Sequence, residues 1–281
     1  MVNHNGNIIK IGDSKLSIKN RGFNYGDALF ETLRVSYKKV LFLEDHYFRL
    51  MASMRILRME IPMNFTLEFL EAEILKLIDA NDQVQKTVRI KFIVYRKEGG
   101  LYTPTTNHVE YLVTSKLLEN DFYEFNTNDY KVDLFKDYYV SPGLLSTLKS
   151  NNRLINIVGG IYAKENELDN CIILNTNKNV LEALNGNLFL VVGNVIKTPP
   201  LSDGCIKGVL RKQIIDIIKL MPEYSIEEAL ISPFELQKAD ELFITNVIKG
   251  IQPVSQYRKR IFAHNVSKNL LSKLNVKVRL S

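Results

Sequence analysis

The apolar residues of this chain repeat with two different periods, and the period changes several times along the sequence. Residues 28–43 show the pattern of two strands joined by a hairpin, and residues 87–95 and 109–114 also have strand character. Between these segments a helical spacing begins at Glu44, and Thr66 is suited to be the N-cap of a second helix. The first half is therefore expected to combine strands with two helices.

A polar and aromatic segment without periodicity, residues 119–128, separates this half from the next. We interpret it as a linker between a smaller N-terminal α/β domain, residues 1–118, and a larger C-terminal domain, residues 129–281. Mixed strands and helices in two halves predict an α+β protein of two domains. The second half is expected to contain strands at 131–134, 171–174, 180–183, 187–192 and 241–246, and helices at 152–167, 208–220 and 264–274.

The composition of the 281 residues excludes several classes of protein. With 46% hydrophobic and 24% charged residues, the chain is neither mostly disordered nor a collagen-like repeat. No apolar run approaches the length of a membrane-spanning helix, and the first residues lack the layout of a signal peptide. Cys171 and Cys205 are too few for a disulfide framework. We therefore expect a cytoplasmic protein without a membrane partner.

The charge balance is basic, with a net charge of +6, and this opens the question of a nucleic-acid partner. The 37 basic and 31 acidic residues are dispersed, and the densest basic run is only residues 258–260. Nucleic-acid binding needs basic residues that cluster on one face. We therefore expect no nucleic-acid partner, and a mild positive field suits a small anionic substrate.

Common catalytic signatures are missing from the sequence. It has no Walker-type glycine loop, no Gly-x-Ser-x-Gly elbow and no His-Glu-x-x-His, and its four histidines have no ligand spacing, so we expect no metal. Four separated patches are more informative when they are taken together. They are residues 21–34 (RGFNYGDALFETLR), 46–50 (HYFRL), 148–154 (LKSNNRL), and 180–189 (VLEALNGNLF) continued by 208–211 (GVLR).

In this order and spacing, the patches resemble the class IV aminotransferase family of pyridoxal-phosphate (PLP) enzymes. The resemblance runs from about Asn5 to Val254. It implies a two-domain D-amino-acid aminotransferase-like fold with PLP in the cleft between the domains, and a homodimer. PLP chemistry needs a lysine that holds the aldehyde and shuttles a proton. Lys149 matches that lysine and would be carried by the C-terminal domain; its alternative is an ordinary surface lysine.

The resemblance also implies which residues hold the cofactor. Glu182 matches the carboxylate that keeps the pyridine nitrogen protonated, and Arg49 matches an arginine that binds the phosphate. Further phosphate contacts would come from the turn that opens a helix at Gly208, Val209 and Leu210, and from Asn246 and Val247. Leu210 and Val247 stand where the family commonly has threonine, so backbone amides would carry more of the binding.

Three features distinguish members of the family. The pattern Lys149-x-x-Asn152-x-Leu154 resembles both 4-amino-4-deoxychorismate lyases and D-amino-acid aminotransferases and argues against branched-chain aminotransferases. Thr32, a candidate substrate contact, resembles the lyases. The Asn246 loop that ends in Pro-Val also resembles lyases. Arg96 and the glycine pair that follows it resemble lyases too, but Leu101 stands near the place of the lyases' second arginine. Candidate anchors for the substrate carboxylates are therefore Arg96, Lys97 and Arg153.

The favoured hypothesis is a PLP-dependent 4-amino-4-deoxychorismate lyase that releases pyruvate and 4-aminobenzoate, a folate precursor. The alternative is an amino-acid aminotransferase of the D-amino-acid or branched-chain type, which would use the same Lys149, Glu182 and Arg49. A non-catalytic relative is disfavoured because these three residues are intact.

Overall fold

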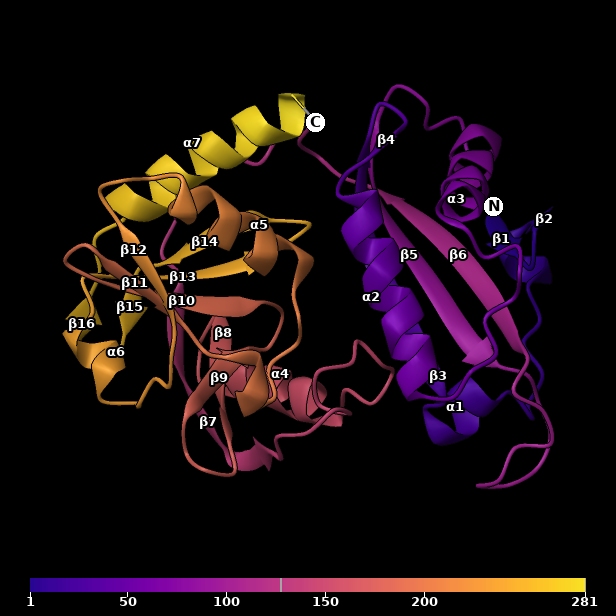
Figure 1. Cartoon of the computed structure of the whole chain (residues 1–281), viewed down its shortest axis with the longest axis horizontal. Helices are drawn as coiled ribbons and strands as arrows, with labels where there is room; N and C mark the ends of the chain where they lie inside the picture. Colours follow the sequence, from indigo (N-terminus) through magenta and orange to yellow (C-terminus); the bar gives the residue numbers. More distant parts are fainter. Residues whose placement is uncertain (127, 281) are drawn as a thin grey trace. The chain divides into compact units, whose positions relative to one another are not determined.

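The computed structural model describes residues 1–126 and 128–280 (Figure 1). Residue 127, within the predicted linker, and residue 281, at the end of the predicted C-terminal domain, lie outside the described residues. Contacts between residues divide the chain into two compact units. The first unit comprises Met1–Asp121 and Leu148–Asn152, and the second comprises Phe122–Thr147 and Arg153–Ser281.

The first unit is built on a six-stranded sheet in which all neighbouring strands are antiparallel. The strand order is β2-β1-β6-β5-β3-β4, and β3 pairs with β5 over its whole length. The pairing of β3 with β4 confirms the predicted hairpin. The strands are β1 (Val2–His4), β2 (Asn7–Ile9), β3 (Ala28–Ser36), β4 (Lys39–Val40), β5 (Thr87–Arg96) and β6 (Val109–Leu117).

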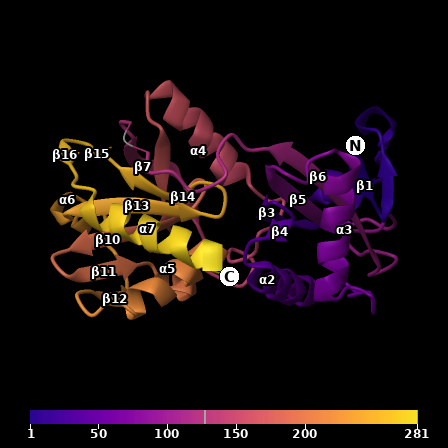
Figure 2. The same ribbon diagram turned by 90° about the horizontal axis from the view of Figure 1, so that it is seen from above.

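Two helices, α2 (Leu43–Ile56) and α3 (Leu67–Ala80), cover one face of this sheet (Figure 2). The Thr66 hydroxyl accepts a hydrogen bond from the Phe69 N–H, so the predicted N-cap of α3 is confirmed. Alternate residues of the strands, such as Leu29 and Leu33 of β3, point into the core beneath the helices. A short helix, α1 (Arg21–Tyr25), precedes β3 and was not predicted, because five residues carry too little periodic signal.

A segment distant in sequence completes the edge of β3. The strand β4 pairs only with Val35 and Ser36, so the edge of β3 near Ala28 and Phe30 is open to another segment. The Phe30 N–H donates to the Lys149 carbonyl at 2.8 Å, and the Asn151 N–H donates to the Ala28 carbonyl at 3.0 Å. Lys149 therefore groups with the first unit, whereas the sequence placed it in the C-terminal domain.

The second unit contains two five-stranded mixed sheets with the orders β12-β11-β10-β13-β14 and β16-β15-β7-β8-β9. Leu134 of β7 and Leu188 of β10 belong to one apolar core, so the two sheets share their buried faces. The strands are β7 (Lys131–Val140), β8 (Asn170–Asn175), β9 (Val180–Ala183), β10 (Asn187–Val192), β11 (Val195–Thr198), β12 (Ser225–Glu228), β13 (Glu241–Asn246), β14 (Gly250–Val254), β15 (Gln256–Tyr257) and β16 (Arg260–Ile261).

Helices pack on both sheets of this unit. Helix α4 (Leu154–Glu165) packs against β7 and β8, and α5 (Val209–Lys219) and α7 (Asn265–Leu280) pack against β13 and against each other (Figure 1). A one-turn helix, α6 (Glu235–Lys238), precedes β13. Among the helices that the structure describes, none is both long and apolar enough to cross a membrane.

Candidate active site

Lys149 lies beside β3 in the first unit. Backbone hydrogen bonds of the Lys149 carbonyl and the Asn151 N–H, which flank Ser150, hold the segment against the strand, and Leu148 anchors it in the core. The Nζ atom of Lys149 lies 4.6 Å from the centre of the Phe30 ring. An ammonium over an aromatic face is attracted to the ring, so this contact favours one position of the lysine amine.

Arg49 is held by a buried carboxylate of β3. Its Nε donates to Oε1 of Glu31 at 2.7 Å, and its Nη2 contacts Oε2 of the same residue. Glu31 alternates with Phe30 and Thr32 along β3 and points to the face that α2 covers. Burial alone would raise the pKa of Glu31, but the charge of Arg49 and the hydrogen bonds of Arg49 and His46 lower it to about 2. The carboxylate is therefore ionised and fixes the arginine.

His46 completes this cluster. Its Nδ1 lies 2.7 Å from Oε2 of Glu31, and the side chain is fully buried. Burial lowers the pKa of His46 more than Glu31 raises it, and the charges of Arg49 and Lys149 lower it further. A neutral ring that donates through Nδ1 to a carboxylate has Nε2 as an acceptor. That Nε2 is buried and has no hydrogen-bond partner within the described part of the chain.

Glu182 lies in β9 of the second unit and is nearly buried, with 6% of its surface exposed. Its Oε2 accepts hydrogen bonds from Nδ2 of Asn187 at 3.2 Å and from the Ile206 N–H at 3.1 Å. Two donors on one oxygen fix the direction of the carboxyl plane. The residue thus has the rigid placement that a partner for a ring N–H requires.

Asn187 is the residue of this group that the sequence did not single out. Besides Glu182, it binds the Ile206 carbonyl through Nδ2 at 2.9 Å. A Cβ atom on Gly208 would lie 1.9 Å from its Oδ1, so a larger residue at 208 would force the Asn187 side chain out of its hydrogen bonds. The asparagine therefore joins the Glu182 carboxylate to the turn that begins α5. A lone asparagine in an Asn-Gly-Asn sequence carries no local signal of this role.

The turn at Gly208 starts α5 as predicted. Val209 and Leu210 are its first two residues, both buried, and no side chain caps the helix. The first N–H groups of a helix have no intrahelical acceptor and attract anions. This end of α5 has the donor geometry that a phosphate needs.

Asn246 and Val247 lie where β13 turns into β14. The Oδ1 atom of Asn246 accepts from the N–H groups of Ile248 at 3.1 Å and Lys249 at 2.9 Å, so this side chain shapes the turn. The Val247 carbonyl accepts from the hydroxyl of Tyr123 at 2.8 Å. The predicted contribution of this loop would therefore come from its backbone.

Three of the four candidate substrate residues, Thr32, Arg96 and Arg153, have different surroundings. Thr32 is buried in β3, and Arg153 directly precedes α4 in the second unit. Arg96 is buried and bonded on every side of its guanidinium. Its acceptors are the carboxylate of Asp27, the Asn107 side chain and the carbonyls of Leu57 and Arg58, at 2.6 to 3.2 Å. This arginine holds the end of β5 to the end of α2.

The loop after β5 is fixed by a second buried arginine. Arg21 donates to Asp27 at 2.9 Å and to the carbonyls of Gly99 and Leu101 at 3.1 and 2.6 Å. Leu101 itself is 75% exposed. Within the described residues, no three or more His, Cys, Asp or Glu side chains come together as a metal site.

Comparison with known proteins identifies the family of the chain. The family described as amino-transferase class IV matches residues 28–257. A probable branched-chain-amino-acid aminotransferase of Aquifex aeolicus is 28% identical over 273 residues, which cover 91% of this chain and 83% of the relative.

Two solved structures have the same fold. A branched-chain amino acid aminotransferase of Thermobaculum terrenum, described in its PLP form, superposes with a TM-score of 0.86 at 20% identity and covers 99% of this chain and 93% of its own. A putative 4-amino-4-deoxychorismate lyase of Legionella pneumophila has a TM-score of 0.80 at 26% identity, with 94% of this chain and 95% of its own covered. Since the family match spans most of the sequence, this chain belongs to the class IV amino-transferases.

Proposed function

We propose that this chain is a PLP-dependent amino-acid aminotransferase, in which Lys149 carries the cofactor and moves the proton. The observation that carries the proposal is the placement of Lys149, which backbone hydrogen bonds fix beside β3 in the unit that also holds Arg49. The Aquifex relative is named as an aminotransferase, and the Thermobaculum protein of the same fold is described with PLP. The lyase hypothesis has less support from the relatives.

The donor set fits a phosphorylated pyridine aldehyde. The amine of Lys149 suits the aldehyde, and Glu182 suits a protonated ring nitrogen. The uncapped start of α5 and the guanidinium of Arg49 suit the phosphate. Nε2 of buried His46 is an acceptor without a hydrogen-bond partner among the described residues, which is expected beside a ligand site. We propose that these residues, together with the backbone of the Val247 turn, hold one cofactor.

Each residue then has a defined task. When bound, PLP supplies an electron sink for the pair that remains after a proton leaves the substrate. Lys149 would remove that proton at the α-carbon of the amino acid. It would then deliver a proton to the carbon of the cofactor that was the aldehyde. Glu182 holds the proton of the ring nitrogen. Arg49 and the start of α5 bind the phosphate, so that the lysine amine meets the same face of each substrate.

The substrate carboxylates separate the two candidate activities. An amino acid presents one α-carboxylate, whereas 4-amino-4-deoxychorismate carries two carboxylates. Arg96 is buried and bonded to Asp27, Asn107 and the end of α2. These contacts do not support the hypothesis that Arg96 anchors a second carboxylate. Thr32 and Arg153 remain proposed substrate contacts.

The lyase stays a second candidate on one specific observation. The Legionella protein described as a putative lyase is 26% identical and covers nearly the whole chain. One shared lysine could serve both reactions.

The test is to follow both reactions with one PLP-loaded preparation. One arm offers L- and D-amino acids, including branched-chain ones, with 2-oxoglutarate, and measures the new keto acid. The other offers 4-amino-4-deoxychorismate without a keto acid and measures pyruvate and 4-aminobenzoate. We expect turnover in the first arm, and Lys149→Ala should abolish it. The control is Lys91→Ala, since Lys91 is another half-buried lysine that lies over Phe30, and this variant should retain turnover. Turnover in the second arm alone would replace the aminotransferase by the lyase.

We also propose that the protein works in the cytosol as a homodimer, as the family resemblance implies. One face of α4 supports a subunit contact, because Leu154, Ile157 and Ile161 follow helical spacing and are 75%, 56% and 53% exposed. Light scattering of the purified protein at several concentrations tests the mass. A monomer at micromolar concentration would contradict the proposed dimer.

A further inference from the structure

Tyr123 lies in the segment that the sequence indicated as a linker, yet it is anchored as firmly as a core residue. Only 4% of its surface is exposed. Asn275 of α7 binds its backbone in both directions: the Tyr123 N–H donates to Oδ1 at 3.2 Å, and Nδ2 donates to the Tyr123 carbonyl at 2.8 Å. The backbone of Tyr123 is thus fixed to helix α7 of the second unit.

The side chain of Tyr123 spans the turn between β13 and β14. Its hydroxyl donates to the Val247 carbonyl at 2.8 Å, at the start of the turn. Its ring packs on Gly250 at the end of the turn, where an added Cβ would lie 2.8 Å from the ring carbons. Gly250 also has a φ of +76°, a conformation that favours glycine. One tyrosine therefore supports both ends of the turn.

The turn is held from within as well. The peptide group between Val247 and Ile248 has its carbonyl bound by Tyr123 and its N–H bound by Oδ1 of Asn246. Asn246 itself is paired with Gly250 in the β13–β14 ladder. With both neighbours fixed, the peptide group that contains the Val247 N–H has little freedom to rotate.

We propose that Tyr123 is a positioning residue for the cofactor phosphate, because its hydroxyl sets the orientation of the Val247 turn. This role rests on the proposed function, in which the backbone of this turn faces the phosphate. In this role the tyrosine acts through the turn, by its hydrogen bond to the Val247 carbonyl. Val247 stands where the family commonly has threonine, so the turn depends on backbone donors for the phosphate. The direction of these donors therefore matters more here than in relatives whose threonine hydroxyl also binds.

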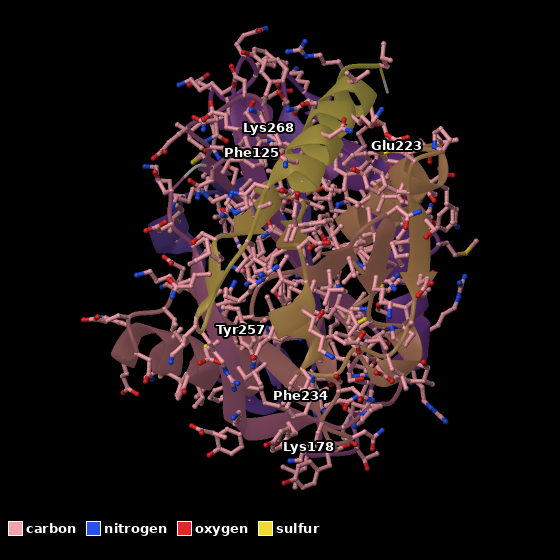
Figure 3. All side chains as sticks on the ribbon, turned by 90° about the vertical axis from the view of Figure 1, so that its left-hand side faces the viewer. Phe125, Lys178, Glu223, Phe234, Tyr257 and Lys268 are labelled. Carbon is pink, nitrogen blue, oxygen red and sulfur yellow. The ribbon has the colours of Figure 1, made fainter. Side chains whose placement is uncertain are left out.

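Tyr123→Phe removes the hydroxyl and keeps the ring on Gly250. The chain also offers a matched control, since Tyr257 (labelled in Figure 3) is a fully buried tyrosine of the same unit whose hydroxyl has no hydrogen-bond partner among the described residues. Tyr257→Phe therefore makes the same chemical change without removing a bond. Both variants are expected to fold, and circular dichroism and melting temperature verify this.

The readout is a ratio of two dissociation constants, measured by equilibrium dialysis for PLP and for pyridoxal, which lacks the phosphate. Loss of one net hydrogen bond corresponds to roughly a two- to twelvefold change in an equilibrium constant. In Tyr123→Phe we expect the constant for PLP to rise by about this factor and the constant for pyridoxal to change less than about twofold. The phosphorus-31 chemical shift of bound PLP should also move in Tyr123→Phe and stay in place in Tyr257→Phe.

The outcomes separate the two levels of the proposal. If the wild-type protein does not bind PLP, the proposed function fails and this role fails with it. If the wild type binds PLP and Tyr123→Phe keeps the wild-type ratio and phosphorus shift, only the role of Tyr123 is wrong. A loss of affinity that is equal for PLP and pyridoxal would show a general structural role and would also overturn the positioning role.

Discussion

Replacing Glu31 by glutamine tests whether the buried cluster of Glu31, His46 and Arg49 stabilises the first unit. The variant keeps the shape of the side chain and removes its charge. The pKa of Glu31 falls from 4.5 to about 2 on folding, a change of about 2.5 units. At about 1.4 kcal/mol per unit, the ionised carboxylate contributes about 3–4 kcal/mol to the free energy of unfolding near neutral pH. Breaking a buried ion pair by removing one partner typically costs about 3–5 kcal/mol, which agrees.

The pH dependence of this effect has a definite direction. A carboxyl group whose pKa is lowered on folding stabilises the folded state above its unfolded pKa of 4.5, and this contribution disappears as the pH falls toward about 2. The difference in stability between the wild type and Glu31→Gln should therefore be constant from pH 7 to about 5 and shrink below pH 4.5. His46 adds a separate slope in both proteins, because burial lowers its pKa and the unfolded state takes up the proton first below pH 6.5.

Hydrogen exchange followed by mass spectrometry can assign the effect to one unit. Peptides from β3 and α2 should exchange faster in Glu31→Gln, while peptides from β13 should not. Glu241→Gln is the matched control, since this glutamate is equally buried in the second unit and accepts from the N–H groups of Val266 and Ser267. A change below about 0.5 kcal/mol in Glu31→Gln, or a difference that persists unchanged to pH 3, would refute the electrostatic reasoning.

Three further predictions follow from the second unit. Asn187→Asp places a second carboxylate against that of Glu182 and removes the hydrogen bond that Asn187 donates to it. The dissociation constant for PLP should therefore rise by about 10- to 100-fold in a spectroscopic titration. Gly208→Ala should lower the free energy of unfolding by about 1–3 kcal/mol, whereas Gly160→Ala, in an open place on α4, should raise it by about 0.5–1 kcal/mol; urea titrations of both variants measure the contrast. Burial raises the pKa of Cys171 to about 11 and that of Cys205 to about 12, so both thiols should resist iodoacetamide at pH 8 in the folded protein and react in urea.

Local patterns in the sequence predicted local structure well. The hairpin of β3 and β4, the two helices of the first unit and the Thr66 cap each depend on residues close together in sequence. The strands β11, β12 and β14 were missed because they are short and their partners in the sheet decide where they form. The strand β7 was predicted too short, since its second half is partly exposed and shows no regular period.

The candidate residues divide in the same way. Lys149, Glu182 and Arg49 became candidates because several patches in order resemble a family, and each patch is a local pattern. The unit to which Lys149 belongs was not predictable, because its segment pairs with a strand edge about 120 residues earlier. Asn187 and Tyr123 were missed for a related reason, since their partners at Ile206 and Val247 lie far along the chain and only the fold brings them together.

The residues that made the sequence resemble a lyase have structural explanations. Gly99 and Gly100 have φ values of +123° and +72°, a backbone conformation that other residues rarely adopt, so the loop needs this pair whatever the substrate. Arg21 binds the carbonyls of this loop, and Arg96 shares the carboxylate of Asp27 with it. One carboxylate and several carbonyls thus hold two buried guanidinium groups in place, and withdrawing either would leave buried polar groups unpaired. A sequence motif cannot distinguish an arginine that supports a loop from one that binds a substrate, whereas burial and hydrogen-bond partners can. The lyase-like loop is therefore explained by the fold itself, and the choice between the two activities depends on residues outside it.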